Sequence, residues 1–419
     1  MKFSTPRGTK DILPAEIAQW NKIENTCRDL FKIFGYREIR TPIFEETALF
    51  SRSLGSTSDI VQKQLLNVAT KKDRGYSLRP EATAVIVRAY LEHHLDKEES
   101  FVKLFYIGPM FRGERPQKGR LRQFHHIGVE AIGLTSPYLD AEIISLATQI
   151  LDKLGLNGYQ LKINSLGCAK DKEHFSNLLR DSLKAKVKNL CEDCRERFKK
   201  NIFRVLDCKQ EGCRAVVSGL KLDGKYLCPD CQRYFIAVQE NLKLLKVPFN
   251  INFTMVRGLD YYTQTIFEIS HPDLGSQDAL GAGGRYDNLV KELGGPSVGA
   301  IGFAFGFERL ILVWGEKNPP MLPGPDLFIA NLGKEAQEKA FLLLGDLRRT
   351  GISCEMDYSH SSLKSQMRQA NDKKAKLVII LGEDEIKNQE VTLRDMSTGI
   401  QEKIKIKEIA EILKNKLGL

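Results

Sequence analysis

A proline-rich stretch near residue 320 constrains the possible folds of this chain more than any other feature of its sequence. It reads Pro319-Pro320-Met321-Leu322-Pro323-Gly324-Pro325. Proline fixes the backbone φ angle and lacks an amide hydrogen, so neither a helix nor a central strand continues through such a run. The stretch predicts a stiff linker, and a chain of 419 residues is long enough for a domain on each side of it. We expect these domains at residues 1–324 and 325–419.

The residues after the linker alternate between strand-like and helix-like patterns. Apolar runs at 326–330, 352–356 and 377–381 predict strands, and amphipathic runs at about 334–349 and 361–374 predict helices between them. Strands that alternate with helices are typical of a parallel sheet. The carboxyl-terminal part is therefore expected to be a small α/β domain.

The residues before the linker follow a less regular pattern. Helical spacing of apolar residues predicts helices at about 17–34 and 139–154, each followed by a glycine. Strands are expected at 159–164 and, interrupted by glycines, between 251 and 314. Residues 170–245 differ, because they are rich in lysine, arginine and cysteine and show helical pieces with little alternation. We expect this segment to be an inserted helical subdomain.

The bulk composition is typical of a globular protein, with 42% hydrophobic residues. The amino terminus lacks the apolar region of a signal peptide, and the longest apolar stretch, residues 298–314, is interrupted by Glu308 and Arg309. We therefore expect a cytoplasmic protein that does not enter a membrane. The formal net charge of +10 favours a polyanionic partner such as nucleic acid, although many basic enzymes bind none.

Two common nucleotide-binding signatures are missing from the sequence. It contains no GxxxxGK[ST] loop and no GxGxxG turn between a strand and a helix. The glycine-rich run at residues 281–284 has a simpler interpretation than a phosphate loop, namely a tight turn or a close approach of two backbones. Recognition of a nucleotide therefore has to depend on arginine side chains, which stay charged and bind two oxygens in a planar fork.

Three segments carry the arginines on which such recognition would depend. They are Leu78-Arg79-Pro80-Glu81-Ala82-Thr83, Phe111-Arg112-Gly113-Glu114-Arg115, and the apolar segment 302–310, which ends in Glu308-Arg309-Leu310. A charge in an apolar segment needs a ligand or a partner, and a structural ion pair is the alternative to a ligand. Together with Thr41-Pro42-Ile43-Phe44-Glu45, these segments resemble motifs 1, 2 and 3 of the class II aminoacyl-tRNA synthetases.

This resemblance implies an α+β fold in which an antiparallel sheet forms the catalytic domain and motif 1 builds a homodimer interface. Arg112 would bridge the α-phosphate of ATP and the carboxylate of the amino acid, and Arg309 would lie on the nucleotide. The loop that contains Glu114 and Arg120 would contact ATP and the acceptor end of tRNA. Positioning and fixed positive charge suit attack of a carboxylate on a phosphate, because negative charge builds on the phosphoryl oxygens. Mg²⁺ would arrive bound to ATP, and we expect no protein metal ligands in the catalytic site.

A longer segment narrows the resemblance to one amino acid. The run Arg257-Gly258-Leu259-Asp260-Tyr261-Tyr262 and the residues that follow it, through Glu268, resemble the histidine-specific motif of the histidyl-tRNA synthetase family. Without the family resemblance, a pair of neighbouring tyrosines would more often be part of an apolar core. The resemblance covers nearly the whole chain. It implies that histidine and ATP react to histidyl-adenylate and pyrophosphate, and that histidine is then transferred to the 3′ end of histidine tRNA.

The same resemblance assigns the residues that would bind histidine. Glu81 and Thr83 would hold the α-amino group, since a cationic amine calls for a carboxylate. Glu130 and Tyr262 would hydrogen-bond the imidazole ring, with Tyr261 alongside, because a neutral imidazole offers one N–H and one lone pair. A site with buried hydrogen-bonding groups rejects amino acids that would leave those groups unpaired.

Two further residues complete the expected pocket. Arg257 would act beside Arg112 on the carboxylate and the α-phosphate, where other class II enzymes often place a metal ion. His126 stands where members of the family usually carry a glutamine that contacts the α-amino group. A neutral imidazole accepts a hydrogen bond from an ammonium group, whereas a protonated imidazole repels it. We therefore expect the substitution His126→Gln to keep activity and to extend it toward lower pH.

The nine cysteines include two CxxC pairs in the basic insertion, a pattern that favours reduced thiols or a metal over a secreted disulfide framework. Four thiolates form a common tetrahedral Zn²⁺ site. The gap between the two pairs, however, is longer than the usual roughly 15–20 residues. Two interpretations therefore stay open, free thiols or a Zn²⁺ ion held by Cys191, Cys194, Cys228 and Cys231.

The carboxyl-terminal domain resembles the anticodon-binding domain of several class II synthetases, and its basic edge would meet tRNA phosphates through Arg368, Lys373, Lys374 and Lys376. The main alternative is a binding module, a synthetase-like regulatory subunit of ATP-phosphoribosyltransferase. Such paralogues usually lack this last domain and do not keep the run at residues 257–262. This chain has both the domain and the run. The expected partners are histidine, ATP, histidine tRNA and a second copy of the chain.

Overall fold

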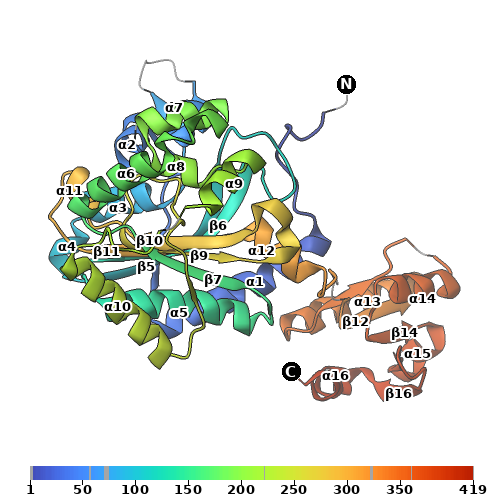
Figure 1. The fold of residues 1–419 in the computed structure, drawn as a ribbon. Coiled ribbons are helices and arrows are strands. Elements are labelled where there is room, and N and C mark those ends of the chain that lie inside the picture. The colour runs from blue at the N-terminus through green and yellow to red at the C-terminus, as the bar shows by residue number, and fades with distance from the viewer. Residues whose placement is uncertain are drawn as a thin grey trace. The chain divides into compact units, whose positions relative to one another are not determined.

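The computed structural model describes residues 3–55, 58–69, 75–220, 222–320, 324–359 and 361–418, apart from the side chains of residues 276 and 277. The chain divides into two compact units, residues 1–320 and 321–419, which differ in colour in Figure 1. Three residues of the expected linker, Met321, Leu322 and Pro323, lie outside the described residues. The predicted boundary between residues 324 and 325 therefore stays a prediction.

An eight-stranded sheet forms the centre of the first unit. Its neighbouring strands are antiparallel except for β1 with β5 and β7 with β8. In spatial order the strands are β1 (Arg37–Glu38), β5 (Val102–Phe111), β6 (Gln123–Ile132), β11 (Ala300–Gly306), β10 (Ala279–Arg285), β9 (Thr263–Ser270), β7 (Gln160–Ser165) and β8 (Asn250–Ile251). A second, three-stranded sheet contains β2 (Phe44–Glu46), β4 (Tyr76–Leu78) and β3 (Asn67–Val68).

The hairpin of β5 and β6 separates two apolar cores, because successive residues of a strand face opposite sides of a sheet. Ile127 and Val129 of β6 belong to the core that α1 (Pro14–Ile33), α5 (Pro137–Lys153) and α10 (Pro229–Leu244) cover. Leu104 and Tyr106 of β5 belong to the other core, which contains residues of α2 (Thr47–Ser53), α3 (Thr83–Glu92) and α11 (Leu289–Glu292). Glu130 pairs with Leu104 across the hairpin, so its carboxyl group lies on the side of this second core.

Local sequence signals explain the helices on the first face. α1 (Pro14–Ile33) and α5 (Pro137–Lys153) both begin with proline, which suits the first helical position, and Gly35 and Gly155 adopt positive φ just beyond their ends. The helices predicted at 17–34 and 139–154 are confirmed, as is the strand predicted at 159–164. α12 (Phe307–Gly315) follows β11 directly.

The basic segment between β7 and β8 is helical, as expected. Its helices are α6 (Ala169–Lys184), α7 (Glu192–Lys200), α8 (Phe203–Leu206), α9 (Glu211–Ser218) and α10 (Pro229–Leu244). Their buried residues, such as Phe175 and Val238, belong to the same core as α1 and α5. The insertion is therefore packed onto the body of the first unit rather than on a core of its own.

The second unit is an α/β domain around a five-stranded sheet. Its strands are, in spatial order, β13 (Cys354–Met356), β12 (Leu327–Asn331), β14 (Leu377–Leu381), β15 (Glu390–Asp395) and β16 (Gln401–Lys405). The first three are parallel, which confirms the predicted strands, and α13 (Lys334–Arg349) and α14 (Leu363–Asp372) confirm the predicted helices. The antiparallel strands β15 and β16, together with α15 (Glu383–Asn388) and α16 (Ile409–Leu417), were not predicted. β15 has only Val391 and Leu393 as apolar residues and β16 only Ile404, so the hydrophobic periodicity there is too short to mark a strand by itself.

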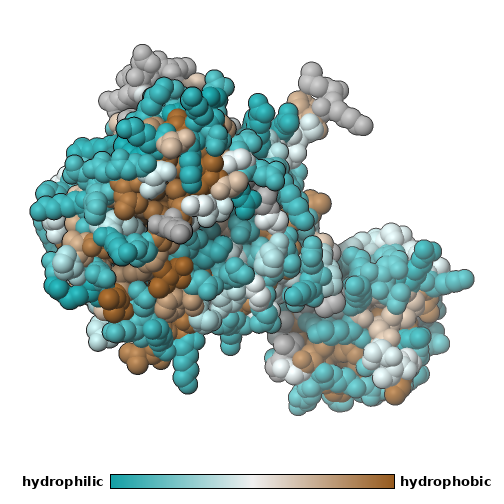
Figure 2. Space-filling view, in the orientation of Figure 1, coloured by the Kyte–Doolittle hydropathy of each residue, from teal (hydrophilic) through white to brown (hydrophobic). Residues whose placement is uncertain are grey.

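The surface of the molecule is mostly hydrophilic in the view of Figure 2, with apolar side chains emerging around α6 and α8. In the part of the chain that the structure describes, no helix combines the length and the apolar character needed to cross a membrane.

Candidate active site

A pocket of about 260 Å³ lies on the side of the sheet that carries Tyr106 and Glu130. All the site residues expected from the sequence line it. They come from the start of α3, from β6 and the loop that connects it to β5, from the segment before β9, and from α12. They are Glu81, Thr83, Arg112, Glu114, Arg120, His126, Glu130, Arg257, Tyr261, Tyr262 and Arg309. Residues separated by more than 200 positions in the sequence thus share one cavity.

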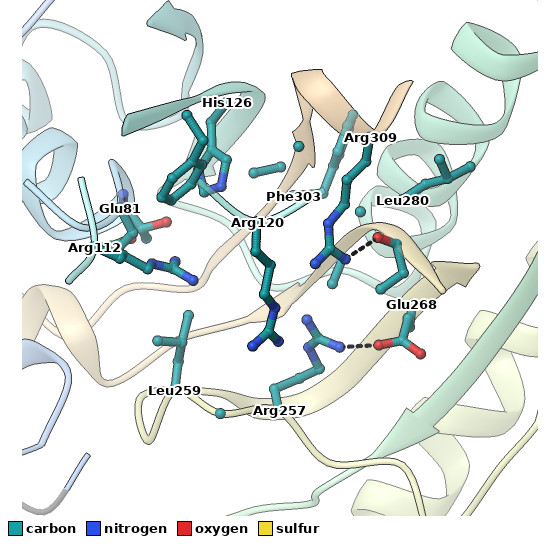
Figure 3. A pocket seen from close by; sticks show the side chains of 18 of the residues that line it. Glu81, Arg112, Arg120, His126, Arg257, Leu259, Glu268, Leu280, Phe303 and Arg309 are labelled. Carbon is teal, nitrogen blue, oxygen red and sulfur yellow. Dashed lines mark hydrogen bonds and ion pairs between the residues drawn. The ribbon is translucent and has the colours of Figure 1, made fainter. Parts of the chain in front are cut away.

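Four arginines converge in this pocket, which carboxylates also line. Figure 3 shows Arg112, Arg120, Arg257 and Arg309 approaching the same space from different parts of the chain. Burial, followed by the positive charges of Arg120 and Arg112, lowers the pKa of Arg309 to about 10. This mutual repulsion would be relieved by an anion that several guanidinium groups contact at once.

Two of the arginines are oriented by carboxylates. Arg257 forms an ion pair with Glu268 of β9 through Nη1 and Oε2. Arg120 Nη1 lies 2.9 Å from Glu114 Oε2, so the two loop residues hold each other. Glu268 is the last residue of the motif that begins at Arg257, and its sequence position alone did not indicate a role. The ion pair assigns it one, since it sets the direction of the Arg257 guanidinium.

The other two arginines are oriented by backbone carbonyl groups. Arg112 Nε donates to the carbonyl oxygen of Pro80 at 2.9 Å. Arg309 Nη1 donates to the carbonyl oxygen of Ala279 at 2.5 Å, and its Nε donates to that of Gly119 at 3.2 Å. The first residue of β10 and the β5–β6 loop therefore hold the Arg309 guanidinium at the pocket.

A buried carboxylate stands at the amino-terminal end of α3. Glu81 accepts hydrogen bonds from the backbone N–H groups of Thr83 at 2.7 Å and Ala84 at 2.9 Å. The side chain is only 3% exposed, and burial raises its pKa above the ordinary value, against the lowering effect of these hydrogen bonds. The first turn of the helix thus positions a carboxylate inside the cavity.

Glu130 is the centre of a buried hydrogen-bond network. Thr83 Oγ1 donates to Glu130 Oε1 at 2.7 Å, and the Tyr286 hydroxyl donates to Oε2 at 2.6 Å. Burial raises the pKa of Glu130 to about 8 despite these donors. Gly302 of the neighbouring strand makes room for the carboxyl group, because a Cβ atom there would lie 1.9 Å from Glu130 Oε2. Tyr286 was missed in the sequence, since the glycine run just before it was interpreted as a close approach of backbones and its partner Glu130 is far away along the chain.

The tyrosine pair of the segment that resembles the histidine-specific motif belongs both to the pocket and to the second apolar core. Tyr261 and Tyr262 are 5% and 7% exposed, their ring centroids lie 4.8 Å apart, and both are members of the second apolar core. Both also line the cavity. A role in the core and a role in the binding site are therefore compatible, because both rings pack in the core and also line the cavity.

His126 has a different electrostatic environment from the one that we expected. Its Nδ1 atom is buried without a hydrogen-bond partner among the described residues. Burial lowers the pKa of the ring well below the ordinary value, and the charges of Arg112 and Arg309 lower it further. The ring is therefore neutral throughout the usual assay range. A ring with this lowered pKa removes the reason for expecting a pH effect of His126→Gln.

We now predict that the variant His126→Gln retains activity with an unchanged pH profile. Both side chains are neutral above pH 6.5 and both offer an acceptor to an ammonium group. The measurement is the KM for histidine between pH 6.5 and 8.5 in both proteins. A KM ratio that changes several-fold across this range would show that the wild-type ring titrates there, contrary to its lowered pKa.

Glu308 and Arg309 bind separate partners, so they are not explained by an ion pair with each other. Glu308 accepts from the backbone N–H of His125 at 2.9 Å and lies 2.9 Å from its ring Nδ1. That ring in turn meets Trp20 edge to face. Glu308 thus ties α12 to β6, while Arg309, one residue on, is directed at the pocket.

Two other sequence features have structural roles. Arg79 donates to the carbonyl oxygens of Thr41 at 3.0 Å and Pro109 at 2.9 Å, and so ties the expected motif 1 to β5. The glycine run lies in β10, where a Cβ atom on Gly283 would come within 2.3 Å of the Gly302 carbonyl oxygen. A close approach of two backbones, the simpler interpretation of this run, is confirmed.

The cysteines of the insertion do not form the single group that was expected. Two separate clusters occur among the described residues, one of Cys191, Cys194, Cys208 and Cys213 and one of Cys168, Asp171, Cys228 and Cys231. The four-cysteine site made of both CxxC pairs is therefore wrong. The reason is that α8 and α9 bring later cysteines to the first pair, whereas the start of α6 meets the second pair at the start of α10.

Comparison with known protein families agrees with this geometry. Residues 8–310 match the model of the histidyl-tRNA synthetase family, and residues 326–416 match that of the anticodon-binding domain. Among curated relatives, histidine–tRNA ligases from Desulforudis audaxviator and Natranaerobius thermophilus are 47% and 44% identical. Their alignments cover 99% and 100% of this chain and the same shares of the relatives.

Solved structures extend the comparison to the fold. The apo histidyl-tRNA synthetase of Staphylococcus aureus is 35% identical with a TM-score of 0.82, over 99% of this chain and 100% of that one. A structure described as an ATP phosphoribosyltransferase regulatory subunit/histidyl-tRNA synthetase from Bacillus halodurans is 21% identical with a TM-score of 0.67, covering 91% of this chain and 99% of that one. At that identity the likeness concerns the fold alone, and the regulatory alternative is not favoured. The chain therefore belongs to the histidyl-tRNA synthetase family, with the class II catalytic fold and the carboxyl-terminal anticodon-binding domain expected from its motifs.

Proposed function

We propose that this chain is a histidine–tRNA ligase and that the arginine-lined pocket performs both of its steps. In the first step histidine and ATP form histidyl-adenylate and release pyrophosphate. In the second step the histidyl group passes to the 3′ end of histidine tRNA. The observation that carries the proposal is the meeting of four guanidinium groups with a buried polar network in one cavity.

The arginines would stabilise the charge that develops when the histidine carboxylate attacks the α-phosphate. Arg112 and Arg257 would contact the carboxylate and the α-phosphate, and Arg309 would lie on the nucleotide. Glu114 and Arg120 in the loop would contact ATP. Their fixed positions support this assignment, because groups that are already oriented need no reorganisation as the charge moves. ATP-dependent ligation suits this site, and Mg²⁺ would enter with the triphosphate.

The polar network would recognise histidine itself. Glu81 and Thr83 would hold the α-amino group near the start of α3, and His126 would offer an acceptor from β6. Glu130 and Tyr262 would bind the two ring nitrogens. Specificity would follow because another side chain in this space leaves buried oxygen atoms of Glu130 and the tyrosines without a partner.

The direct test of this proposal is histidine-dependent exchange of pyrophosphate into ATP by the full-length protein. We expect exchange with histidine and none above background with proline or threonine. Aminoacylation of histidine tRNA under the same conditions tests the second step. A protein that is folded and binds ATP but shows no exchange with histidine would refute the proposal.

Glu130 predicts a pH dependence for histidine binding. Its pKa is raised from the usual 4.5 to about 8 by burial, so the free enzyme carries a protonated Glu130 at pH 7. A carboxylate that accepts the ring N–H has to lose this proton. With a pKa of about 8, 1/KM for histidine should therefore rise about fivefold between pH 7 and pH 8 and about twofold more before it flattens near pH 9. The variant Glu130→Gln cannot titrate and should bind more weakly with a flat profile. Parallel profiles of the two proteins would contradict this role.

Homodimer formation is a further part of the proposal. Ile43 and Phe44, in the segment that resembles motif 1, are 44% and 50% exposed in the single chain. Two large apolar side chains next to each other at the surface support an interface there. Sedimentation equilibrium should give twice the chain mass of 47.4 kDa, and Phe44→Glu should shift the protein toward monomer. A wild-type monomer at micromolar concentration would contradict the expectation.

Transfer to tRNA would use the second unit as well. The basic edge expected there is more neutral than its sequence implies, because three of its members pair with carboxylates. These pairs are Arg368 with Asp372, Lys373 with Glu355, and Lys376 with Asp326. Exposed pairs of this kind are weak, so tRNA phosphates could still displace the acidic partners.

A further inference from the structure

Four cysteine sulfur atoms meet in the insertion without being bonded to one another. Cys191 precedes α7, Cys194 lies in its first turn, Cys208 follows α8, and Cys213 lies in α9. All four Sγ atoms lie within 4.8 Å of one another, and those of Cys191 and Cys208 are 3.9 Å apart. Zinc–sulfur bonds of about 2.3 Å in a tetrahedron place the sulfur atoms about 3.8 Å apart, whereas a disulfide requires about 2.05 Å. The spacing fits a shared metal ion and not a disulfide.

We propose that Cys191, Cys194, Cys208 and Cys213 bind one structural Zn²⁺ ion that holds part of the pocket wall in place. Four thiolates in a compact, mostly buried cluster are the ligand set that favours tetrahedral zinc, and a closed set of four leaves no position for a substrate. The backbone N–H of Cys191 donates to Cys213 Sγ at 3.2 Å. Hydrogen bonds of this kind orient thiolate ligands around a metal.

The connection to the pocket runs through Cys208. Its two neighbours, Asp207 and Lys209, both line the catalytic pocket and lie 3.0 Å apart as an ion pair. They sit in the short connection between α8 and α9, where no sheet or long helix fixes the backbone. A metal bond to Cys208 would anchor this connection between its two pocket residues.

The preceding residues of the insertion touch the histidine motif as well. Asn201 Nδ2 donates to Asp260 Oδ1 at 3.1 Å, and Arg204 Nη2 donates to the carbonyl oxygen of Gly258 at 3.5 Å. The segment from residue 201 to residue 209 therefore lies against the loop that carries Arg257. Zinc at its end would stabilise the whole contact, so Asp207 and Lys209 are positioned by the metal and do not bind it.

The second cluster, of Cys168, Asp171, Cys228 and Cys231, has three thiols and a carboxylate instead of four thiols. It provides a matched control. The Asp171 carboxylate already accepts the backbone N–H groups of Cys168 at 3.1 Å and Cys228 at 2.9 Å. These bonds join the start of α6 to the start of α10 without a metal. The substitution Cys228→Ser keeps the backbone N–H and removes a thiol outside the proposed site.

The test is the zinc content of reduced full-length protein purified without chelator, measured by plasma mass spectrometry. We expect Cys208→Ser and Cys213→Ser to contain one equivalent of zinc less per chain than the wild type, and Cys228→Ser to match the wild type. Co²⁺ substituted into the wild-type protein should show thiolate-to-cobalt charge-transfer bands. It should also show the intense ligand-field absorption of a tetrahedral site at the red end of the visible spectrum. This last measurement does not depend on whether a variant folds.

Three results would overturn the proposal. They are a wild-type zinc content well below one equivalent after incubation with zinc, zinc that is lost with Cys228→Ser but kept with Cys208→Ser, and an octahedral cobalt spectrum. The positioning role predicts that Cys208→Ser raises the KM for ATP about tenfold in pyrophosphate exchange, while Cys228→Ser leaves it unchanged. Loss of zinc with an unchanged KM would refute that role. The zinc content itself does not rest on the proposed activity, so the two can fail separately.

Discussion

Replacing Arg257 with glutamine is expected to reduce the kcat of histidine-dependent pyrophosphate exchange by about 10²–10³-fold, the usual cost of removing one fixed donor at a developing charge. Arg257 lines the pocket with Arg112 and Arg309 and is held by its ion pair with Glu268. Glutamine retains hydrogen-bond donors but not the charge. The loss should therefore appear in kcat more than in the KM for ATP, because charge on the phosphoryl oxygens is greatest in the transition state.

Two control variants separate this effect from damage to the fold. Arg257→Lys keeps the charge but loses the planar fork, and it should recover about tenfold of the activity lost in Arg257→Gln. Arg349→Gln changes an exposed arginine of the second unit and should leave exchange unaltered. Thermal unfolding of each variant shows whether Glu268, left without its partner, destabilises the protein. Exchange within threefold of wild type in a folded Arg257→Gln protein would contradict the assigned role.

Deleting residues 326–419 is expected to leave pyrophosphate exchange within about threefold of wild type and to reduce aminoacylation at least about 100-fold, equivalent to about 2.7 kcal/mol. The reason is that the two units have separate cores. The buried residues of the first unit's cores run from Trp20 to Trp314, and those of the second unit's cores run from Leu327 to Leu413. The pocket is lined by residues 81–309 alone. Adenylate formation therefore needs nothing from the deleted part, whereas tRNA would lose its contacts with the anticodon-binding domain.

The comparison of the two assays makes this experiment decisive. A truncated protein with a cooperative thermal transition and normal exchange establishes that the first unit is intact. The loss of charging should then appear chiefly as a raised KM for tRNA, and higher salt should weaken the full-length enzyme in the same direction. Equal loss of both activities in a folded truncated protein would contradict this division of labour.

Much of the fold followed from periodicity, and the failures have a common cause. The long helices α1 and α5 and the strand β14 were predicted because each buries an apolar stripe or run that is visible along the chain. β15 and β16 were missed because they bury only Val391, Leu393 and Ile404, too short an apolar pattern to stand out before the two strands pair. The site residues were named from motifs, whereas Tyr286 was not, since its contact with Glu130 joins positions 156 residues apart.

The sequence by itself determined the chemistry that is available, namely the arginines, the histidine motif, the linker and the thiols. These features depend on residue type and on spacing along the chain. The tertiary structure alone decided which cysteines meet, because α8 and α9 carry Cys208 and Cys213 to the first CxxC pair. It also decided that His126 stays neutral, because burial and the charges of Arg112 and Arg309 act on it across the fold. Electrostatics and metal geometry depend on distances in space, and a sequence specifies those only once its chain has packed.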